Sequence, residues 1–347
     1  MDRLAPVRLD VEGWIRNIRR EGTPDRVYLF EHGIADEIFD ALDARFGVSA
    51  CLDRRAPDFD RRRAVAMHRF LGMEFFRVFP PGARMQVASR TGAWAEEHTG
   101  RIASWQDFEQ YPWNRAQDAD LSVYEYYERA LPPDMRVFQV IDLWECVRDL
   151  FGYETFCYML YENPDLVEAV FAKVGEFDAA VTRACCDFRC FGAIYVSDDL
   201  GYKTSTMLAP ETIRRYILPW HRTMADIAHE RGKLAWLHSC GQMYELIDDY
   251  IDIVRIDAKH SFEDVILPVT EAKRRYGTRL SLLGGMDVDI LARRDEAAIR
   301  AKTREILDVC VPGGGYCLGS GNWVTSYIPL DHYLAMLDEA RRYGQRP

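Results

Sequence analysis

The sequence predicts an α/β protein, namely a (β/α)8 TIM barrel with an N-terminal helical extension. In the second half of the chain, short apolar stretches alternate five times with segments of helical periodicity. This alternation is typical of a parallel sheet that is covered by helices. The first half adds three further apolar stretches, which brings the number of predicted strands to eight. No glycine-rich dinucleotide-binding turn follows a strand, so a barrel is favoured over an open nucleotide-binding sheet.

The second half supplies the clearest elements, because each apolar stretch is bounded by turn residues and followed by a helical pattern. The strands predicted there are 192–197, 234–237, 253–256, 280–283 and 315–318. The helices predicted between and after them are 210–232, 243–250, 261–276, 295–310 and 329–343. The first of these has proline at its first turn and glycine at its end, which are ordinary helix boundaries. The third begins with the capping-box pattern "SFED".

The first half is less regular. Its predicted strands are 75–79, 86–89 and 137–141, and its predicted helices are 36–46, 61–71 and 164–185. The last helix has Asn163 as its cap and Pro164 in its first turn. Residues 1–70 are therefore predicted to be an N-terminal extension packed on the barrel, which occupies residues 71–347. Residues 90–135 are interpreted as a long insertion near the barrel mouth.

Charge and composition exclude several classes of protein. The 347-residue chain has a formal net charge of −11 and a pI of about 5.3, so nucleic acid and anionic membranes are poor partners. No apolar stretch approaches the roughly 20 residues that a membrane span needs. The first residues are charged and lack the apolar core of a signal peptide. The nine cysteines lie mostly in apolar segments and are expected to be reduced, as in a cytoplasmic protein.

Polar and ionisable residues follow every predicted strand of the second half. In a (β/α)8 barrel, the active site lies in the loops at the carboxyl ends of the strands. We therefore expect these residues to line one functional cleft. They are Asp198, Asp199, Tyr202, Lys203, His238, Cys240, Lys259, His260, Asp287, Ser320 and Asn322.

The stretch "LHSCGQ" places His238 and Cys240 two residues apart, directly after a predicted strand. Zinc accepts imidazole nitrogen and thiolate sulfur, and a catalytic zinc has three protein ligands with one position left open. A third ligand would come from another strand, and Cys317, Asp199 or Asn322 are candidates. The alternative is that the histidine makes an ordinary hydrogen bond while the cysteine only packs.

Other residues at the strand ends have two interpretations each. Adjacent side chains on a strand point to opposite faces, so only one of Asp198 and Asp199 is expected to face the cleft. That residue would act as an acid, a base or a ligand for a cationic group, and the alternative role for one of the pair is to cap the following turn. Lys203 and Lys259 either bind an anionic group or are solvated surface residues. His260 is a catalytic group or a loop hydrogen bonder.

Several motifs together resemble the uroporphyrinogen decarboxylase superfamily. They are "ENPDLVEAVFAKV", "LAPETIRRYILPWHRTMADIAHERG", "LHSCG", "GGMDVD" and "LGSGNW", and they extend over about half of the chain. The resemblance implies a (β/α)8 barrel. In the decarboxylase branch, the resemblance aligns Tyr158 with a catalytic tyrosine. The family's last-loop histidine falls near Ser320, where this sequence has no histidine.

The second branch of this superfamily contains cobamide-dependent methyltransferases. Its thiol-methylating members hold zinc with His-x-Cys and a later cysteine, and the resemblance places the first two at His238 and Cys240. The later cysteine falls near Asn322, and Cys317 lies five residues before it. The resemblance therefore implies a zinc site made by His238 and Cys240, completed by Cys317 or an oxygen ligand.

The resemblance favours a methyltransferase that moves a methyl group between a methylated small molecule or thiol and a corrinoid held by a partner protein. Asp199, Lys259 and His260 would orient the substrate. A cofactor-free decarboxylase or lyase acting on a carboxylated substrate is the first alternative. A non-catalytic corrinoid- or tetrapyrrole-binding protein is the second. A monomer and a homodimer are both compatible with the sequence.

Overall fold

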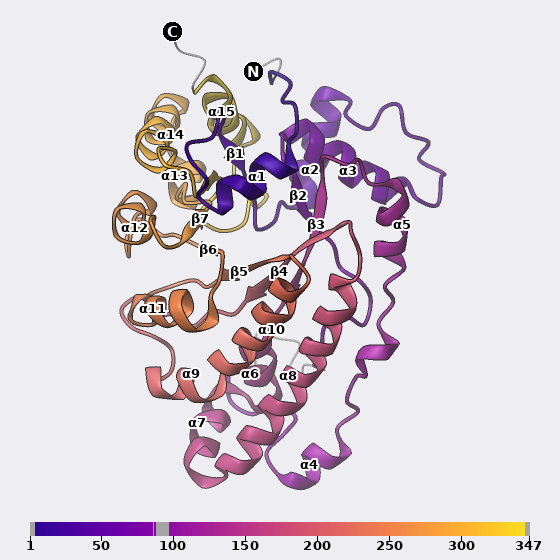
Figure 1. Ribbon diagram of the computed structural model, residues 1–347, viewed down its shortest axis with the longest axis vertical. Coiled ribbons are helices and arrows are strands. Elements are labelled where there is room, and N and C mark those ends of the chain that lie inside the picture. The colour runs from indigo at the N-terminus through magenta and orange to yellow at the C-terminus, as the bar shows by residue number, and fades with distance from the viewer. Residues whose placement is uncertain (1–3, 86, 88–96, 344–347) are drawn as a thin grey trace. The chain divides into compact units, whose positions relative to one another are not determined.

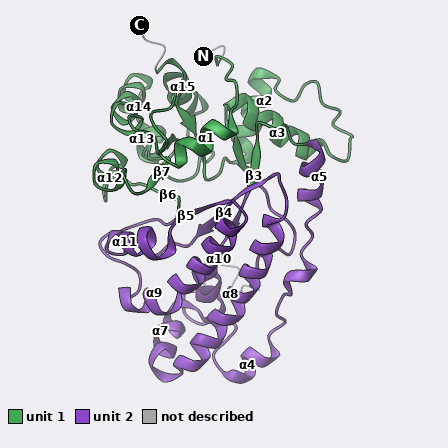
Figure 2. Ribbon diagram, viewed as in Figure 1, with its two compact units in different colours: residues 1–77, 131–137, 257–347 green, residues 78–130, 138–256 purple. Residues whose placement is uncertain are grey.

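The computed structural model describes residues 4–85, 87 and 97–343, and it contains eight strands that alternate with helices (Figure 1). The chain divides into two compact units, each made of separate stretches of sequence (Figure 2). Unit 1 comprises residues 1–77, 131–137 and 257–347, and unit 2 comprises residues 78–130 and 138–256.

Unit 1 contains the strands from both ends of the chain. Its strands are β1 (Tyr28–Leu29), β2 (Phe75–Arg77), β6 (Ala258–His260), β7 (Ser281–Leu283) and β8 (Tyr316–Leu318). Its helices are α1 (Val11–Ile18), α2 (Asp36–Phe46), α3 (Phe59–Leu71), α12 (Val269–Tyr276), α13 (Val288–Arg293), α14 (Glu296–Cys310) and α15 (Leu330–Arg342). Strand β8 pairs in parallel with β1 on one side and with β7 on the other, and β7 pairs in parallel with β6.

Unit 2 contains β4 (Phe191–Ser197), β5 (Leu234–His238) and most of β3 (Arg136–Ile141). Its α-helices are α4 (Trp105–Gln110), α5 (Ser122–Ala130), α6 (Leu143–Phe151), α7 (Tyr153–Glu162), α8 (Pro164–Cys186), α9 (Pro210–Tyr216), α10 (Leu218–Glu230) and α11 (Ile247–Asp249). Short 3-10 helices, η1 (Ala116–Asp118) and η2 (Tyr244–Leu246), and a π-helix, η3 (Tyr250–Val254), complete it. Strands β4 and β5 pair in parallel over five residues each.

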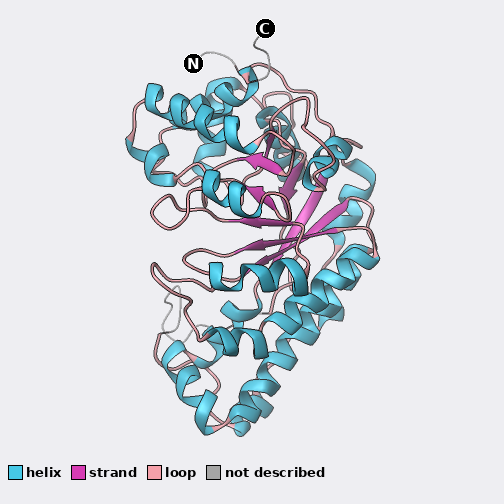
Figure 3. Cartoon of the chain, turned by 60° about the vertical axis from the view of Figure 1, so that its left-hand side comes forward, coloured by secondary structure: helices cyan, strands magenta, loops and turns pink. Residues whose placement is uncertain are grey.

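Parallel strands joined by helices are the architecture of an α/β TIM-barrel-like protein, so the predicted fold class is confirmed (Figure 3). The strands are buried along nearly their whole length, which explains why they are continuous apolar stretches instead of alternating ones. Asn163 caps α8 by accepting a hydrogen bond from the Leu166 amide, as its sequence position predicts. Among the described residues, no helix has the length and apolarity that crossing a membrane requires.

Two predicted elements are wrong in the stretch 250–276. The predicted strand 253–256 is the end of η3 and the turn after it, where Arg255 adopts a left-handed conformation. The strand is β6, a few residues later, so Lys259 and His260 lie within it and not after it. The predicted helix 261–276 begins only at Val269, because the residue before a proline is disfavoured in helical conformation and Pro268 directly precedes the helix.

The first half differs from its prediction at two strands. The predicted strand 86–89 falls outside the described residues except for Val87, which is not in a strand. The described structure instead has β1 within residues 1–70, where Phe30 continues the pairing by donating its amide to the Leu318 carbonyl at 2.9 Å. The predicted boundary between an extension and the barrel stays a prediction, but the extension contributes this strand to unit 1.

Candidate functional site

The loops after β4 and β5 lie side by side in unit 2. The parallel register aligns Ser197 with His238, and the Asp198 amide donates to the His238 carbonyl at 3.1 Å. The two strands therefore end at the same level. Asp199 follows the first strand and Cys240 follows the second, so both side chains are available at the same edge of the pair.

The side chains of Asp199, His238 and Cys240 converge. His238 Nε2 lies 3.4 Å from Cys240 Sγ and 3.5 Å from Asp199 Oδ1. One ligand atom from each residue can be chosen so that all three lie within 4.8 Å of one another. His238 is buried, while Asp199 and Cys240 are half-buried.

These distances fit a tetrahedral metal ion. Zinc bonds of about 2.0–2.3 Å at tetrahedral angles place neighbouring nitrogen, oxygen and sulfur ligands roughly 3.3–3.6 Å apart. Both distances from His238 Nε2 match this spacing, whereas 3.5 Å is long for a direct nitrogen–oxygen hydrogen bond. One nitrogen, one sulfur and one oxygen donor would hold the ion and leave a fourth position for substrate.

Two glycines allow the backbones of the two loops to approach closely, and hydrogen bonds connect the loops. A Cβ on Gly201 would lie 2.5 Å from the Gln242 nitrogen, and one on Gly241 would lie 2.3 Å from the Gly201 carbonyl carbon. The Cys240 amide donates to Asp199 Oδ1 at 2.8 Å, which orients the carboxylate. Ser239 Oγ accepts from the Leu200 amide at 3.0 Å. Contacts of this kind around a ligand set fix its geometry.

The side chain of Asp198 points into the interior of unit 2, where it contacts His221, and not toward the cluster of Asp199, His238 and Cys240. Its carboxylate contacts His221 Nε2 at 2.7 Å and accepts from the Glu145 amide at 3.1 Å. His221 Nδ1 in turn lies 2.8 Å from the Tyr250 hydroxyl, and Asp198, His221 and Tyr250 are all fully buried. This buried chain anchors the end of β4 to α6, α10 and η3. The expected substrate-binding role of Asp198 stays a prediction.

Glu145 is a residue of this region that the sequence interpretation missed. It lies in the first turn of α6, just after β3, with its side chain 22% exposed. Burial and the charges of Asp198 and Asp199 raise the pKa of its carboxyl to about 8, against the opposing effect of Arg148. The rule that placed the other candidates after their strands would have found it, since the strand 137–141 was predicted.

Three predicted residues of unit 2 lie on its surface. Tyr202 is 68% exposed and Lys203 is also exposed, both on the loop between β4 and α9. Tyr158 is 58% exposed in the middle of α7. Their proposed roles remain predictions.

In unit 1, polar groups gather at the carboxyl ends of β1, β6 and β8. His260 Nε2 lies 3.1 Å from the Ser320 carbonyl, and the His260 ring stacks on His32 with centroids 5.6 Å apart. Ser320 donates through its amide and its hydroxyl to Glu31, at 3.1 and 2.5 Å. Burial raises the pKa of Glu31 to about 8. Glu31 and His32 were missed because β1, the strand that precedes them, was not predicted.

Lys259 is buried and engaged within unit 1. Its ammonium group donates to the Ser261 carbonyl at 2.7 Å and lies 4.7 Å from the centroid of the Phe262 ring. Phe262 also lines a cavity of about 590 Å³, together with the predicted residues Asp287 and Asn322. The other lining residues are Glu263, Val265, Val288, Asp289, Gly321, Trp323, Thr325 and Tyr327.

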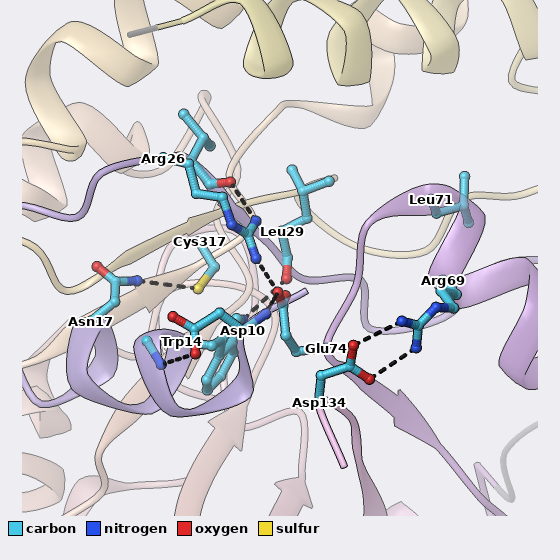
Figure 4. Close-up of polar contacts among 12 residues, drawn as sticks. Asp10, Trp14, Asn17, Arg26, Leu29, Arg69, Leu71, Glu74, Asp134 and Cys317 are labelled. Carbon is cyan, nitrogen blue, oxygen red and sulfur yellow. Dashed lines mark hydrogen bonds and ion pairs between the residues drawn. The ribbon is translucent and has the colours of Figure 1, made fainter. Parts of the chain in front are cut away.

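Cys317 lies in β8 and is fully buried, and Figure 4 shows its sulfur facing Asn17. The side-chain amide of Asn17, in α1, donates a hydrogen bond to the Cys317 sulfur at 3.5 Å. Burial raises the pKa of this thiol well above its ordinary value, and the nearby Glu74 charge raises it further. Asp199 lies next to His238 and Cys240 as a candidate third donor, and the metal-binding role of Cys317 stays a prediction.

The fold and this cluster define an α/β TIM-barrel-like protein with a nitrogen, sulfur and oxygen donor set at the ends of two parallel strands. Residues 144–343, more than half of the chain, match the family model described as Uroporphyrinogen decarboxylase (URO-D). The chain belongs to this family, so the predicted resemblance is confirmed.

Curated relatives come from both branches. A methylated-thiol–coenzyme M methyltransferase of Methanosarcina mazei is 31% identical over 133 residues, which are 38% of this chain and 33% of the relative. A uroporphyrinogen decarboxylase of Cupriavidus necator is 31% identical over 24% of this chain and 23% of the relative. Another, from Thioalkalivibrio sulfidiphilus, is 25% identical over 54% of this chain and 52% of the relative. The matches thus span about half or less of each relative.

A solved structure, a methyltransferase from Methanosarcina mazei, has the same fold. It superimposes with a TM-score of 0.69 over 96% of this chain and 98% of its own, at 16% sequence identity. At this identity the likeness shows the fold alone.

Proposed function

We propose that this protein is a corrinoid-dependent methyltransferase with zinc bound by Asp199, His238 and Cys240. It would move a methyl group between a methylated small molecule or thiol and a cobamide carried by a partner corrinoid protein. The observation that carries the proposal is the convergence of the three donor atoms at distances that suit tetrahedral zinc.

Bound zinc would act as a Lewis acid and would favour the thiolate form of a thiol substrate near neutral pH. The residues of the chain would hold and orient this centre. His238 and Cys240 come from one loop, and Asp199 comes from the loop beside it, held in place by the Cys240 amide. Asp199 and Cys240 are only half-buried, which would allow a substrate to reach the metal.

The named relative from Methanosarcina mazei acts on methylated thiols and coenzyme M, which supports a thiol as donor or acceptor here. A donor set with one sulfur is consistent with that chemistry, because zinc accepts both the protein thiolate and a substrate sulfur.

The second candidate is a cofactor-free decarboxylase, which the family name and the relatives from Cupriavidus and Thioalkalivibrio favour. A decarboxylase of this kind needs no metal, whereas the converging donor atoms of Asp199, His238 and Cys240 suit a metal ion and therefore favour methyl transfer.

The test combines metal content with activity. Protein purified without chelator is expected to contain about one zinc per chain by elemental mass spectrometry, and His238→Ala, Cys240→Ser and Asp199→Asn should each lower this content. Cys157→Ser, which changes a half-buried thiol of α7, is the matched control. Cys317→Ser tests the other expected third ligand and should leave the zinc content unchanged.

Activity is followed as the change in visible absorption when methylcobalamin is demethylated in the presence of a thiol. We expect turnover that chelation abolishes and zinc restores. Far less than one zinc per chain, unchanged by His238→Ala, would contradict the proposal. Carboxy-lyase activity that survives chelation would support the decarboxylase, and a cobamide absorption shift without turnover would indicate a carrier.

A further inference from the structure

Unit 1 contains a second cavity, of about 250 Å³, at the amino-terminal end of β1. Residues 5–8 and 25–27, together with 340, 341 and 343 at the end of α15, form most of its wall. Glu31 and His32, which belong to the carboxyl-end cluster, follow the same strand at its other end. The cavity is thus separate from the candidate groups at the strand carboxyl ends.

Arg341 is a buried cation in this wall without a carboxylate partner among the described residues. Its guanidinium donates only to backbone carbonyls, those of Ala5, Phe70 and Leu71, the last two at 2.9 Å. These bonds use three of its five N–H groups, and Nε has no acceptor in the described part of the chain. The residue is 9% exposed, and burial lowers the pKa of its guanidinium to about 10.

Arg26 adds a second cation to the cavity, and Figure 4 shows its guanidinium reaching Glu74. Glu74 is buried, and one of its carboxylate oxygens accepts hydrogen bonds from Arg26 and from the Asp10 amide. Its other carboxylate oxygen has no hydrogen-bond donor among the described residues. Burial raises the pKa of Glu74 to about 7. Near neutral pH this carboxyl is therefore only partly ionised and compensates Arg26 only in part.

From this geometry we infer that the cavity beside Arg8, Arg26 and Arg341 binds a small oxyanion. The three arginines face one acidic lining residue, Asp25. Arginine is suited to carboxylate, sulfate and phosphate because its planar fork donates two parallel hydrogen bonds. An oxyanion in the cavity would compensate the buried Arg341 charge, which carbonyl dipoles alone do not neutralise.

The test uses sulfate as the probe, because its charge is constant over the neutral pH range. Sulfate binding is measured by calorimetric titration and by thermal unfolding, with chloride replacing sulfate at constant ionic strength. We expect saturable binding and a rise in the melting temperature that follows the same saturation curve. Parallel titrations with inorganic phosphate and acetate distinguish a tetrahedral anion from a carboxylate as the preferred ligand.

Exposed positions provide variants that should fold normally. Arg8→Gln should weaken sulfate binding about tenfold, the size expected for a charge-assisted hydrogen bond, and Asp25→Asn should strengthen it. Arg62→Gln, on the exposed face of α3 outside the cavity, removes the same charge and should have no effect. Sulfate stabilisation that does not saturate, or that Arg8→Gln and Arg62→Gln change equally, would overturn the inference.

Discussion

The clearest quantitative prediction concerns Glu31, whose burial raises its pKa to about 8 from an ordinary value of 4.5. Between these values the folded protein holds one more proton at this position than the unfolded chain. The contribution of Glu31 to stability is therefore complete below pH 4.5 and is lost as the pH rises through 8. Each pH unit corresponds to about 1.4 kcal/mol, so the 3.5-unit difference (8 − 4.5) gives a loss of roughly 5 kcal/mol.

Glu31→Gln tests this reasoning, because a glutamine keeps an oxygen that can accept from the Ser320 amide but carries no charge. Urea unfolding at pH 5, 6, 7 and 8 is the assay. The wild type should lose stability relative to the variant as the pH rises, while the buried Glu74 and Glu145, whose pKa values are also raised, affect both proteins alike. A difference between wild type and variant that is constant from pH 5 to pH 8 would refute the assignment.

Three further changes test the site and the fold. Gly241→Ala should lower the zinc affinity of the proposed site and cost about 1–3 kcal/mol in urea unfolding, because a φ of 75° is strained for alanine and the new Cβ would meet backbone. Gly232→Ala is the control: its φ is similar but its Cβ would point into open space, so it should cost only about 1 kcal/mol and leave zinc binding intact. His221→Phe should destabilise the protein by about 3 kcal/mol or more at pH 7, because it leaves Asp198 buried without its partner, and an effect below 1 kcal/mol would contradict the anchoring role. Asn163→Ala should cost about 1 kcal/mol through loss of the α8 cap, measured by thermal unfolding.

The candidate metal cluster could be predicted because its strands are easy to recognise. Strands β4 and β5 are long, apolar and bounded by turn residues, so their ends were placed to within one residue. Once the ends were known, the barrel rule identified Asp199, His238 and Cys240. The sequence could not decide which of Asp198 and Asp199 turns inward, because that depends on His221, which lies on a different element.

Unit 1 was harder to predict because its strands are short. Strand β1 has only two residues, which is too few to show any periodicity. Glu31 and His32, which follow it in the chain, were therefore not recognised as candidate site residues. The apolar residues before β6 suggested a strand, but packing places them in a π-helix. In both cases tertiary contacts decide the structure, and local sequence carries little information about them.

The proposed zinc set differs in one ligand from the set that the sequence resemblance implies, and the difference has a chemical consequence. Replacing a cysteine by Asp199 keeps two anionic ligands beside a neutral histidine, so the formal charge of the centre is unchanged. A carboxylate oxygen is a harder donor than a thiolate, and this leaves the metal more Lewis acidic toward the substrate. Asp199→Cys should therefore retain zinc and lower turnover, whereas Asp199→Asn removes a charge and should lose zinc. Equal zinc content in both variants and the wild type would show that Asp199 is not a ligand, and the third donor would then have to come from elsewhere in the chain.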